Sequence, residues 1–144
     1  MKKYLKTQSN GEAIEVLAND GAGSSIEAIT ADTTLTAADS GKTYILDATG
    51  EVITLPAVAA GLKFKFICSA ATATTDWTIV SATNVIQGSA IVAGAVVPAA
   101  DENTISLVAT KTLPGDFVEV VSDGTNWYAF GNAVTAAAIT FTAP

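Results

Sequence analysis

The stretch Asp116–Phe130, DFVEVVSDGTNWYAF, has the pattern of a complete β-hairpin. Apolar, strand-favouring residues fill its first half, Ser122–Thr125 contains the Asp-Gly pair typical of hairpin turns, and Asn126–Phe130 returns. The return half is aromatic and holds three of the chain's ten aromatic side chains. We therefore predict a two-stranded ribbon that supplies much of one core face. The residues expected to form this core hairpin are Phe117, Val120, Trp127, Tyr128 and Phe130.

A second hairpin is predicted upstream. Tyr44–Leu46 and Val52–Leu55 are short apolar runs, and Asp47–Gly50 between them has turn composition. Pro56 follows at once, and because proline has no N–H to donate to a sheet, it ends the second strand. The two runs are therefore expected to pair with each other.

Further strands follow from alternation of apolar and polar residues. Leu62–Cys68 alternates with period two, which places its even-numbered residues in the core and Lys63 and Lys65 in water. In Trp77–Ser81, Trp77 and Ile79 share a face. Asn84–Pro98 is rich in Gly and Ala, so it is either a looser pair of short strands or a loop that contacts a neighbour. Two more strands are predicted over Thr104–Val108 and Ala138–Thr142.

The number and spacing of these segments define the fold class. They amount to about eight to ten short antiparallel strands separated by turn signals, with no convincing long helix. A chain of 144 residues suits one domain. We predict an all-β fold, a β-sandwich or jelly roll over residues 32–144, preceded by an extended N-terminal arm over residues 1–31.

The arm differs from the rest in composition. Three of the seven lysines lie in the first six residues of an otherwise acidic chain. Glu12–Leu17 could form a short helix, and Ala13–Leu17 could equally add as an edge strand. The segment is either a docking arm, whose lysines an acidic partner surface would attract, or a solvated terminus. The residues that would bind a partner are Lys2, Lys3, Tyr4, Leu5, Lys6, Ile14, Val16 and Leu17.

Charge and hydropathy exclude several partners. The net charge is −7 and arginine is absent, which argues against direct nucleic-acid binding. No apolar run approaches the 18 residues of a membrane span, and no apolar segment follows the first lysines to form a secretory signal. We therefore expect no membrane contact and synthesis in a cytoplasm. Only 15% of residues are charged, which suits a protein that packs against neighbours.

The residues that most enzymes use are missing or unsuitably placed. Histidine is absent, which removes the commonest general base and metal ligand. Gly41-Lys42-Thr43 ends like a P-loop, but Thr36 stands where the first glycine belongs and a strand follows instead of a helix. Glycosidases use two nearby carboxylates, but among fourteen acids some pair will lie close by chance. Such a pair therefore does not indicate glycosidase chemistry. We predict no enzyme activity and no catalytic residue.

Metal and thiol chemistry are not indicated either. Asp101-Glu102-Asn103 lacks the spaced oxygen ligands of a Ca²⁺ loop and is interpreted as a solvated turn. The single cysteine, Cys68, excludes an internal disulfide and is expected to be a small buried hydrophobe instead of a reactive thiol. We therefore predict neither a cofactor nor a metal site.

Three groups of motifs resemble a β-rich module that recurs in virion proteins of tailed bacteriophages. They are Leu35–Tyr44 (LTAADSGKTY), Ile53–Pro56 with Gly61–Phe64, and Gly115–Glu119 with Asp123–Tyr128 (DGTNWY). The resemblance spans roughly residues 33 to 142 and leaves the arm unmatched. In a short, free-standing chain it is similar to small capsid decoration (cement) proteins. That resemblance implies trimers or other oligomers, with a homotrimer expected, on the outer capsid surface and bound to the major capsid protein. The same hairpin motif occurs in tail-fibre and other appendage or receptor-binding modules, which are the alternative.

Overall fold

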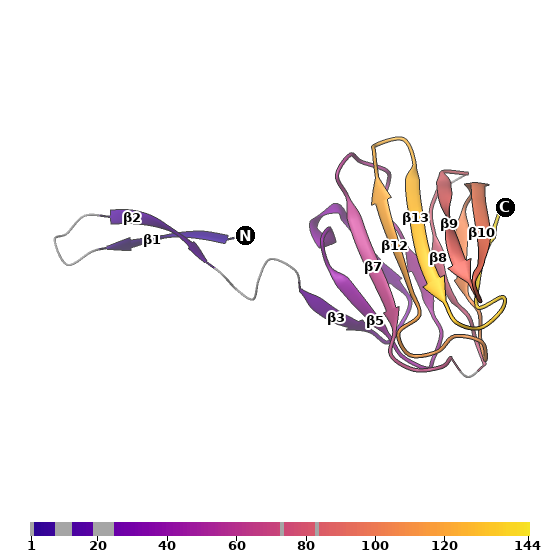
Figure 1. Ribbon diagram of the computed structural model, residues 1–144. Coiled ribbons are helices and arrows are strands. Elements are labelled where there is room, and N and C mark those ends of the chain that lie inside the picture. Colours follow the sequence, from indigo (N-terminus) through magenta and orange to yellow (C-terminus); the bar gives the residue numbers. More distant parts are fainter. Residues whose placement is uncertain (1, 8–12, 19–24, 73, 83) are drawn as a thin grey trace.

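The computed structural model describes residues 2–7, 13–18, 25–72, 74–82 and 84–144, and it confirms the predicted all-β class. Two mixed sheets of seven and five strands pack against each other as a sandwich (Figure 1). The hairpin predicted from Asp116–Phe130 is present. Its strands are β12 (Phe117–Ser122) and β13 (Trp127–Ala133), which pair antiparallel with Val121 opposite Tyr128.

The seven-stranded sheet has the order β10-β9-β13-β12-β7-β5-β3, which can be followed across Figure 1. Its strands other than β12 and β13 are β3 (Ile26–Ile29), β5 (Thr43–Leu46), β7 (Lys63–Cys68), β9 (Ile86–Val92) and β10 (Ala95–Glu102). The segment predicted as a looser strand pair or a loop thus forms a regular antiparallel pair, β9–β10. The sheet also includes β3, which lies before the expected domain start at residue 32.

The five-stranded sheet has the order β14-β11-β8-β6-β4. Its strands are β4 (Thr33–Thr34), β6 (Val52–Thr54), β8 (Trp77–Val80), β11 (Thr104–Leu107) and β14 (Ile139–Thr142). The strands predicted over Trp77–Ser81, Thr104–Val108 and Ala138–Thr142 are therefore confirmed as β8, β11 and β14. A 3-10 helical turn, η1 (Ala37–Asp39), lies between β4 and β5.

The second predicted hairpin is wrong, because β5 and β6 lie in different sheets. The chain crosses from one layer to the other between them, and the same crossing joins β3 to β4 and β7 to β8. This arch places the buried side chains of Leu46 and Ile53 on the inner faces of opposite layers. Successive strands within each layer consequently run parallel, β3–β5–β7 in one sheet and β4–β6–β8 in the other. The expectation of antiparallel strands thus fails for this half of the sandwich.

Large aromatic side chains fill the space between the layers. Trp77 and Trp127 have no exposed surface. The Phe64 and Trp127 rings lie 5.8 Å apart between centroids, and Tyr44 stacks on Phe66 at 5.7 Å. Trp77 Nε1 donates to the carbonyl oxygen of Asp47 at 3.0 Å, so this indole also ties β8 to the loop after β5.

The core hairpin is only partly what the sequence predicts. Val120 and Trp127 are fully buried, whereas Phe117 is half-buried and Tyr128 and Phe130 are exposed. The reason is the two-residue period of a strand, since neighbours of a buried residue point to the opposite face. Residues of Leu62–Cys68 follow the predicted phase, with the even-numbered positions buried and Lys63 exposed.

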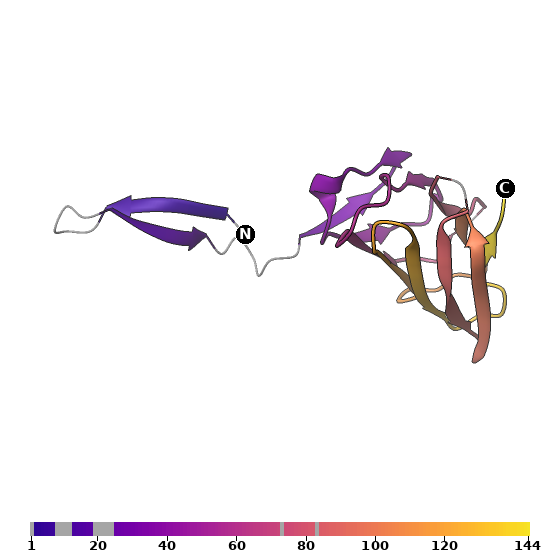
Figure 2. The same ribbon diagram turned by 90° about the horizontal axis from the view of Figure 1, so that it is seen from above.

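The first two strands form a separate two-stranded sheet. Strands β1 (Lys2–Thr7) and β2 (Ala13–Ala18) pair antiparallel, with Tyr4 opposite Val16. Of the two structures considered for this segment, the strand is the one that forms, although residue 12 lies outside the described residues. Figures 1 and 2 show the β1–β2 hairpin standing apart from the two sheets.

Candidate functional site

The outer face of the seven-stranded sheet carries an apolar row. The strand registers align one residue from every strand on this face. From β10 to β3 the row is Val96, Ile91, Asn132, Phe117, Ile67, Ile45 and Ala28. Six of the seven are apolar, so the row is an unusual surface for a face that has no protein layer over it.

Large apolar side chains concentrate at the β10 end of this face. We define the apolar patch as Ile91, Val96, Tyr128, Phe130 and Val134. Phe130 is 55% exposed, Val96 69% and Val134 71%. Val134 directly follows β13 and is held there by its N–H, which donates to Asp116 Oδ1 at 3.1 Å. Clustered apolar exposure of this kind marks interaction surfaces more often than scattered exposure does.

Charged side chains occupy the middle of the same face. Lys65 on β7 lies opposite Glu119 on β12, and Lys63 lies opposite Val121. The Lys65 ammonium also lies 4.8 Å from the centroid of the Phe117 ring, which is a cation–π geometry. These strands therefore bring two positive charges and one negative charge to the edge of the apolar patch.

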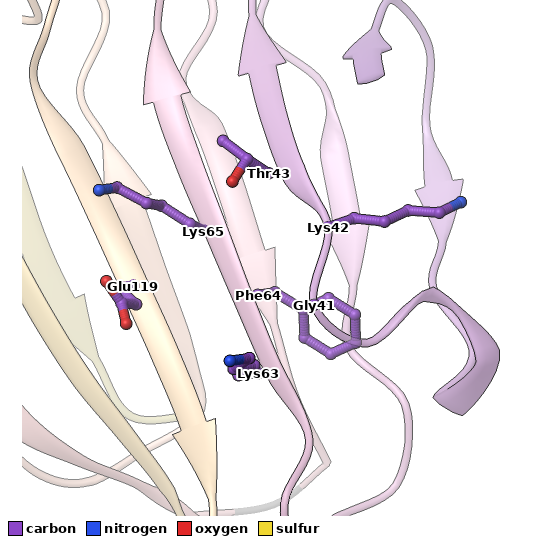
Figure 3. A pocket seen from close by; sticks show the side chains of 7 residues that line it. All are labelled: Gly41, Lys42, Thr43, Lys63, Phe64, Lys65 and Glu119. Carbon is purple, nitrogen blue, oxygen red and sulfur yellow. The ribbon is translucent and has the colours of Figure 1, made fainter. Parts of the chain in front are cut away.

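A small hollow of about 170 Å³ lies beside these charges (Figure 3). Its walls come from the start of β5, from β7 and from β12, and they are Gly41, Lys42, Thr43, Lys63, Phe64, Lys65 and Glu119. Figure 3 shows Lys42 directed away from Lys63 and Lys65. The hollow therefore does not focus all three ammonium groups on one point.

The Lys42 ammonium is engaged by two carboxylates. Its Nζ donates to Asp39 Oδ1 at 2.7 Å and to Glu27 Oε2 at 3.0 Å. The hydrogen bond to Asp39 is the main cause that raises the pKa of Lys42 above its ordinary value. Lys42, together with the N–H and hydroxyl of Thr36, lowers the pKa of Asp39 to about 2. Gly41-Lys42-Thr43 leads into strand β5, as predicted, and its lysine belongs to an ion-pair network that caps η1.

A second hollow, about 480 Å³, lies near the start of β6 and contains three acids. Asp32 Oδ1 accepts the N–H of Val52 at 2.8 Å, and Asp76 Oδ1 accepts that of Ala109 at 2.7 Å. The pKa of Glu51 is raised by burial and by its hydrogen bond to Asp32. Two of the three carboxylates are thus fixed by backbone hydrogen bonds, which is a structural role.

The outer face of the five-stranded sheet differs from the apolar patch and from the hollows that charged residues line. Its strand positions are mostly hydroxyl side chains, aligned across the sheet by the registers. They are Thr34, Val52, Thr54, Thr78, Val80, Thr104, Ser106, Thr140 and Thr142. This face carries no charged side chain at these positions and no cluster of large apolar ones.

The predicted partner-binding residues are placed by the β1–β2 hairpin. Lys2, Lys3, Tyr4, Leu5 and Lys6 lie in β1, and Ile14, Val16 and Leu17 lie in β2. The register pairs Lys6 with Ile14, Tyr4 with Val16 and Lys3 with Leu17. Residues 8–12 and 19–24 lie outside the described residues. The backbone therefore brings the two groups of arm residues together, separately from the apolar patch.

The structure also places the residues weighed for thiol and metal chemistry, Cys68 and Asp101. Cys68 is buried as predicted, and burial raises the pKa of its thiol to about 12. Asp101 and Glu102 are the last residues of β10 and not part of the predicted solvated turn, and Asp101 Oδ1 accepts a hydrogen bond from Gln87 Nε2 at 2.6 Å. Across the described ranges, Asp, Glu and Cys side chains do not gather in groups of three that could hold a metal ion.

Sequence reasoning missed the apolar patch. The sequence pattern of Asn84–Pro98 does not assign Ile91 to a face, and it gives no reason to select Val96 or Val134. The available signal is that β9 carries apolar residues at both phases, since Ala90 and Val92 are buried and Ile91 is exposed between them. Such two-sided strands are typical of a surface that is covered on both faces.

Comparisons with known proteins add no identity. No protein-family model and no curated protein matches the chain. In the part of the chain that the structure describes, no helix has the length and hydropathy needed to cross a membrane.

Proposed function

We propose that this chain is a structural virion protein that decorates and stabilises the outer surface of a bacteriophage capsid by binding the lattice of the major capsid protein. It acts by contact and not by catalysis, without a cofactor and without touching nucleic acid or membrane. The sequence resemblance motivates the proposal. The observation that carries it is the division of the chain into a two-layer sandwich and a lysine-bearing hairpin outside it.

This division suits attachment to a lattice. The sandwich is held by a continuous apolar core and needs no partner to bury it. The β1–β2 hairpin is two-stranded, and isolated two-stranded hairpins are marginal in water, so it gains order by adding to another surface. Repeated weak attachments on a symmetric shell reinforce one another through the multiple contacts they make.

The test is binding of the purified chain to capsids that lack it. We expect saturable decoration, visible by electron microscopy, that weakens as salt rises because exposed charges are screened. A variant with Lys2, Lys3 and Lys6 changed to Gln should lose most of its binding. The matched control changes Lys63, Lys65 and Lys111 to Gln, which alters net charge equally but on the sandwich, and it should still bind.

Removal of residues 1–24 provides an independent check. The truncated chain keeps β3 and the whole sandwich, so its melting temperature should be nearly unchanged while capsid binding is lost. Truncated protein that decorates shells at full occupancy would contradict the proposal. Location of the chain in the tail of virions would instead favour a tail-fibre or receptor-binding module, which should bind host cells when isolated.

A further inference from the structure

We propose that the outer face of the seven-stranded sheet binds the same face of a second copy of this chain. The contact is centred on the apolar patch and extends along the apolar row toward β3. This inference uses only the described surface and does not depend on the role in a capsid. The patch holds five of the eight exposed large apolar side chains among the described residues.

Charge favours a second copy as the partner. The chain carries a net charge of −7, so two copies repel wherever their acids meet. The apolar patch and the apolar row contain no acid. The charged residues facing outward from the central strands are Lys63, Lys65 and Glu119. The central strands of this face thus present two lysines against one acid, so two copies that meet here do not oppose clusters of negative charge.

A second copy could instead add a strand to the edge of the sheet beside the patch, but this edge is protected from pairing. Strand β10 contains Pro98, which has no N–H to donate to a further strand. The register with β9 shifts between Ala99 and Glu102, and Asp101 within that shift has a φ of 60°. Proline and an irregular register are devices that protect sheet edges from pairing. A second copy therefore meets the face of the sheet and does not extend it beyond β10.

The size of the face suits a stable contact. Seven strands about 4.8 Å apart, each about six residues long with a rise of about 3.3 Å, cover roughly 650 Å² in projection. A standard protein interface buries about 800 Å² on each partner. The full outer face, with the relief of its side chains, is thus of the required area, whereas the apolar patch alone is not.

The shape of the face favours two-fold symmetry. A broad sheet face is covered most completely by an equivalent face laid over it, as in sandwiches whose layers cross at about 30°. Such a contact is self-complementary and gives a dimer. A closed ring of three would use two different surfaces, and the remaining exposed large apolar residues of the described chain, Ile26, Val52 and Leu113, are isolated from one another. The geometry therefore favours a dimer over the homotrimer that the resemblance implies.

The experiment measures the mass of the full-length chain in solution as a function of concentration, by sedimentation and light scattering. We expect a monomer–dimer equilibrium. Ile91→Lys places a charge within the apolar patch and should raise the dimer dissociation constant about tenfold or more. The matched control, Val52→Lys, adds the same charge to the outer face of the five-stranded sheet and should leave that constant unchanged. Phe130→Ser, which adds no charge, should also weaken the dimer.

Several outcomes overturn the proposal. These are a monomer at concentrations of about 100 µM, a trimer, or equal effects of Ile91→Lys and Val52→Lys. Loss of the dimer on deleting residues 1–24, with Ile91→Lys still dimeric, would place the contact in the β1–β2 hairpin. Circular dichroism and melting temperature, measured on each variant, establish that it is folded. The two substituted patch residues, Ile91 and Phe130, are at least half exposed, and the control residue Val52 is 40% exposed.

Discussion

Trp127 and Tyr128 are adjacent in sequence and have opposite surroundings. The Trp127 ring packs against Phe64 with no exposed surface, whereas Tyr128 is 36% exposed on the outer face. The Tyr128 hydroxyl donates to Asp123 Oδ2 at 3.1 Å, so this ring supports the turn of its own hairpin. One strand thus supplies the core with one aromatic residue and the surface with the next.

This difference predicts unequal losses of stability. Trp127→Ala should lower the free energy of unfolding by about 3–5 kcal/mol, because the variant loses the transfer energy of a buried ring and leaves a cavity. Tyr128→Ala should be clearly milder, since its ring remains partly hydrated in the folded state. Urea melts of the two variants measure both values. Equal losses would show that the two side chains are buried alike.

The alternation of apolar and polar residues, which predicts the buried positions of a strand, is visible in the sequence. The strands for which this prediction fails can be recognised there as well. The alternation in Leu62–Cys68 gives the correct inner face, because Lys63 and Lys65 both fall in the outward phase. In β13 and β9 both phases carry apolar residues, so sequence alone cannot say that Phe130 and Ile91 are exposed. A two-sided strand leaves its face undecided until the neighbouring layer is known.

At the scale of the element, β9 depends on a glycine. Gly88 has a φ of +122° and lies opposite Ala129 of the parallel strand β13. A Cβ at this position would collide with the backbone carbonyl of Ala129. Gly94, in the turn between β9 and β10, also has a positive φ of +79° but has open space around it. Gly88 thus combines a steric contact with a positive φ, whereas Gly94 has the positive φ alone.

Substitution by alanine should distinguish these effects. Gly94→Ala should cost about 1 kcal/mol from its backbone conformation alone. Gly88→Ala should cost about 1–3 kcal/mol more, because β9 and β13 must also move apart. Chemical denaturation of both variants measures the difference. Similar losses would mean that β9 and β13 lie farther apart than their register indicates.

Connections between elements were harder to predict than the elements. The runs Tyr44–Leu46 and Val52–Leu55 have the composition of a hairpin, and Asp47–Gly50 has that of a turn. An arch between layers needs the same residues, because in both cases two apolar strands flank a polar bend. The difference lies in partners distant in sequence, since β5 pairs with β3 and β7, and β6 with β4 and β8. Local pattern does not contain that information.

For the whole molecule, acid should lower stability more than any change near neutral pH. The pKa of Asp39 is lowered to about 2 by Lys42 and Thr36, and that of Asp123 is lowered by the N–H groups of Asn126 and Thr125. A carboxyl group whose pKa is lowered on folding stabilises the folded state above its unfolded pKa, near 4, and loses that contribution as pH falls. Histidine is absent, so no imidazole titrates between about pH 6 and 8.

The expected profile is flat from about pH 6 to 8 and falls between about pH 4 and 2. The pKa of Glu51 is raised, so its protonation favours the folded state. This offsets part of the loss of stability in acid, but only near the pH at which Glu51 titrates. Asp39→Asn should flatten the acid limb, whereas Glu119→Gln, outside the Thr36–Lys42 network, should leave it unchanged. Urea midpoints at each pH give the profile. An acid limb that Asp39→Asn leaves as steep as before would remove Asp39 as a cause.

The fold class and the position of the β12–β13 hairpin follow from the sequence, but the apolar patch does not. Low charge favours a surface that packs against neighbours, but it does not locate that surface. The apolar row becomes visible only when seven strands are aligned in register, and these strands come from residues 26 to 133. A property spread over such distances is determined by topology, which the sequence patterns leave open.

The stacked arches also determine how the fold can change in length. The units β3–β4 and β5–β6 pair only with the units next to them in sequence, as repeats do in a solenoid. Gain or loss of a whole unit at the β3–β4 end therefore changes each sheet by one strand and leaves the pairings of β7 with β12 and of β8 with β11 intact. The other half has no such freedom, because β13 lies between β9 and β12 and its strands leave sequence order. The half of the sandwich that contains β3 to β8 can therefore vary in its number of strand–arch–strand units, whereas the half that contains β9 to β14 is fixed in length by its topology.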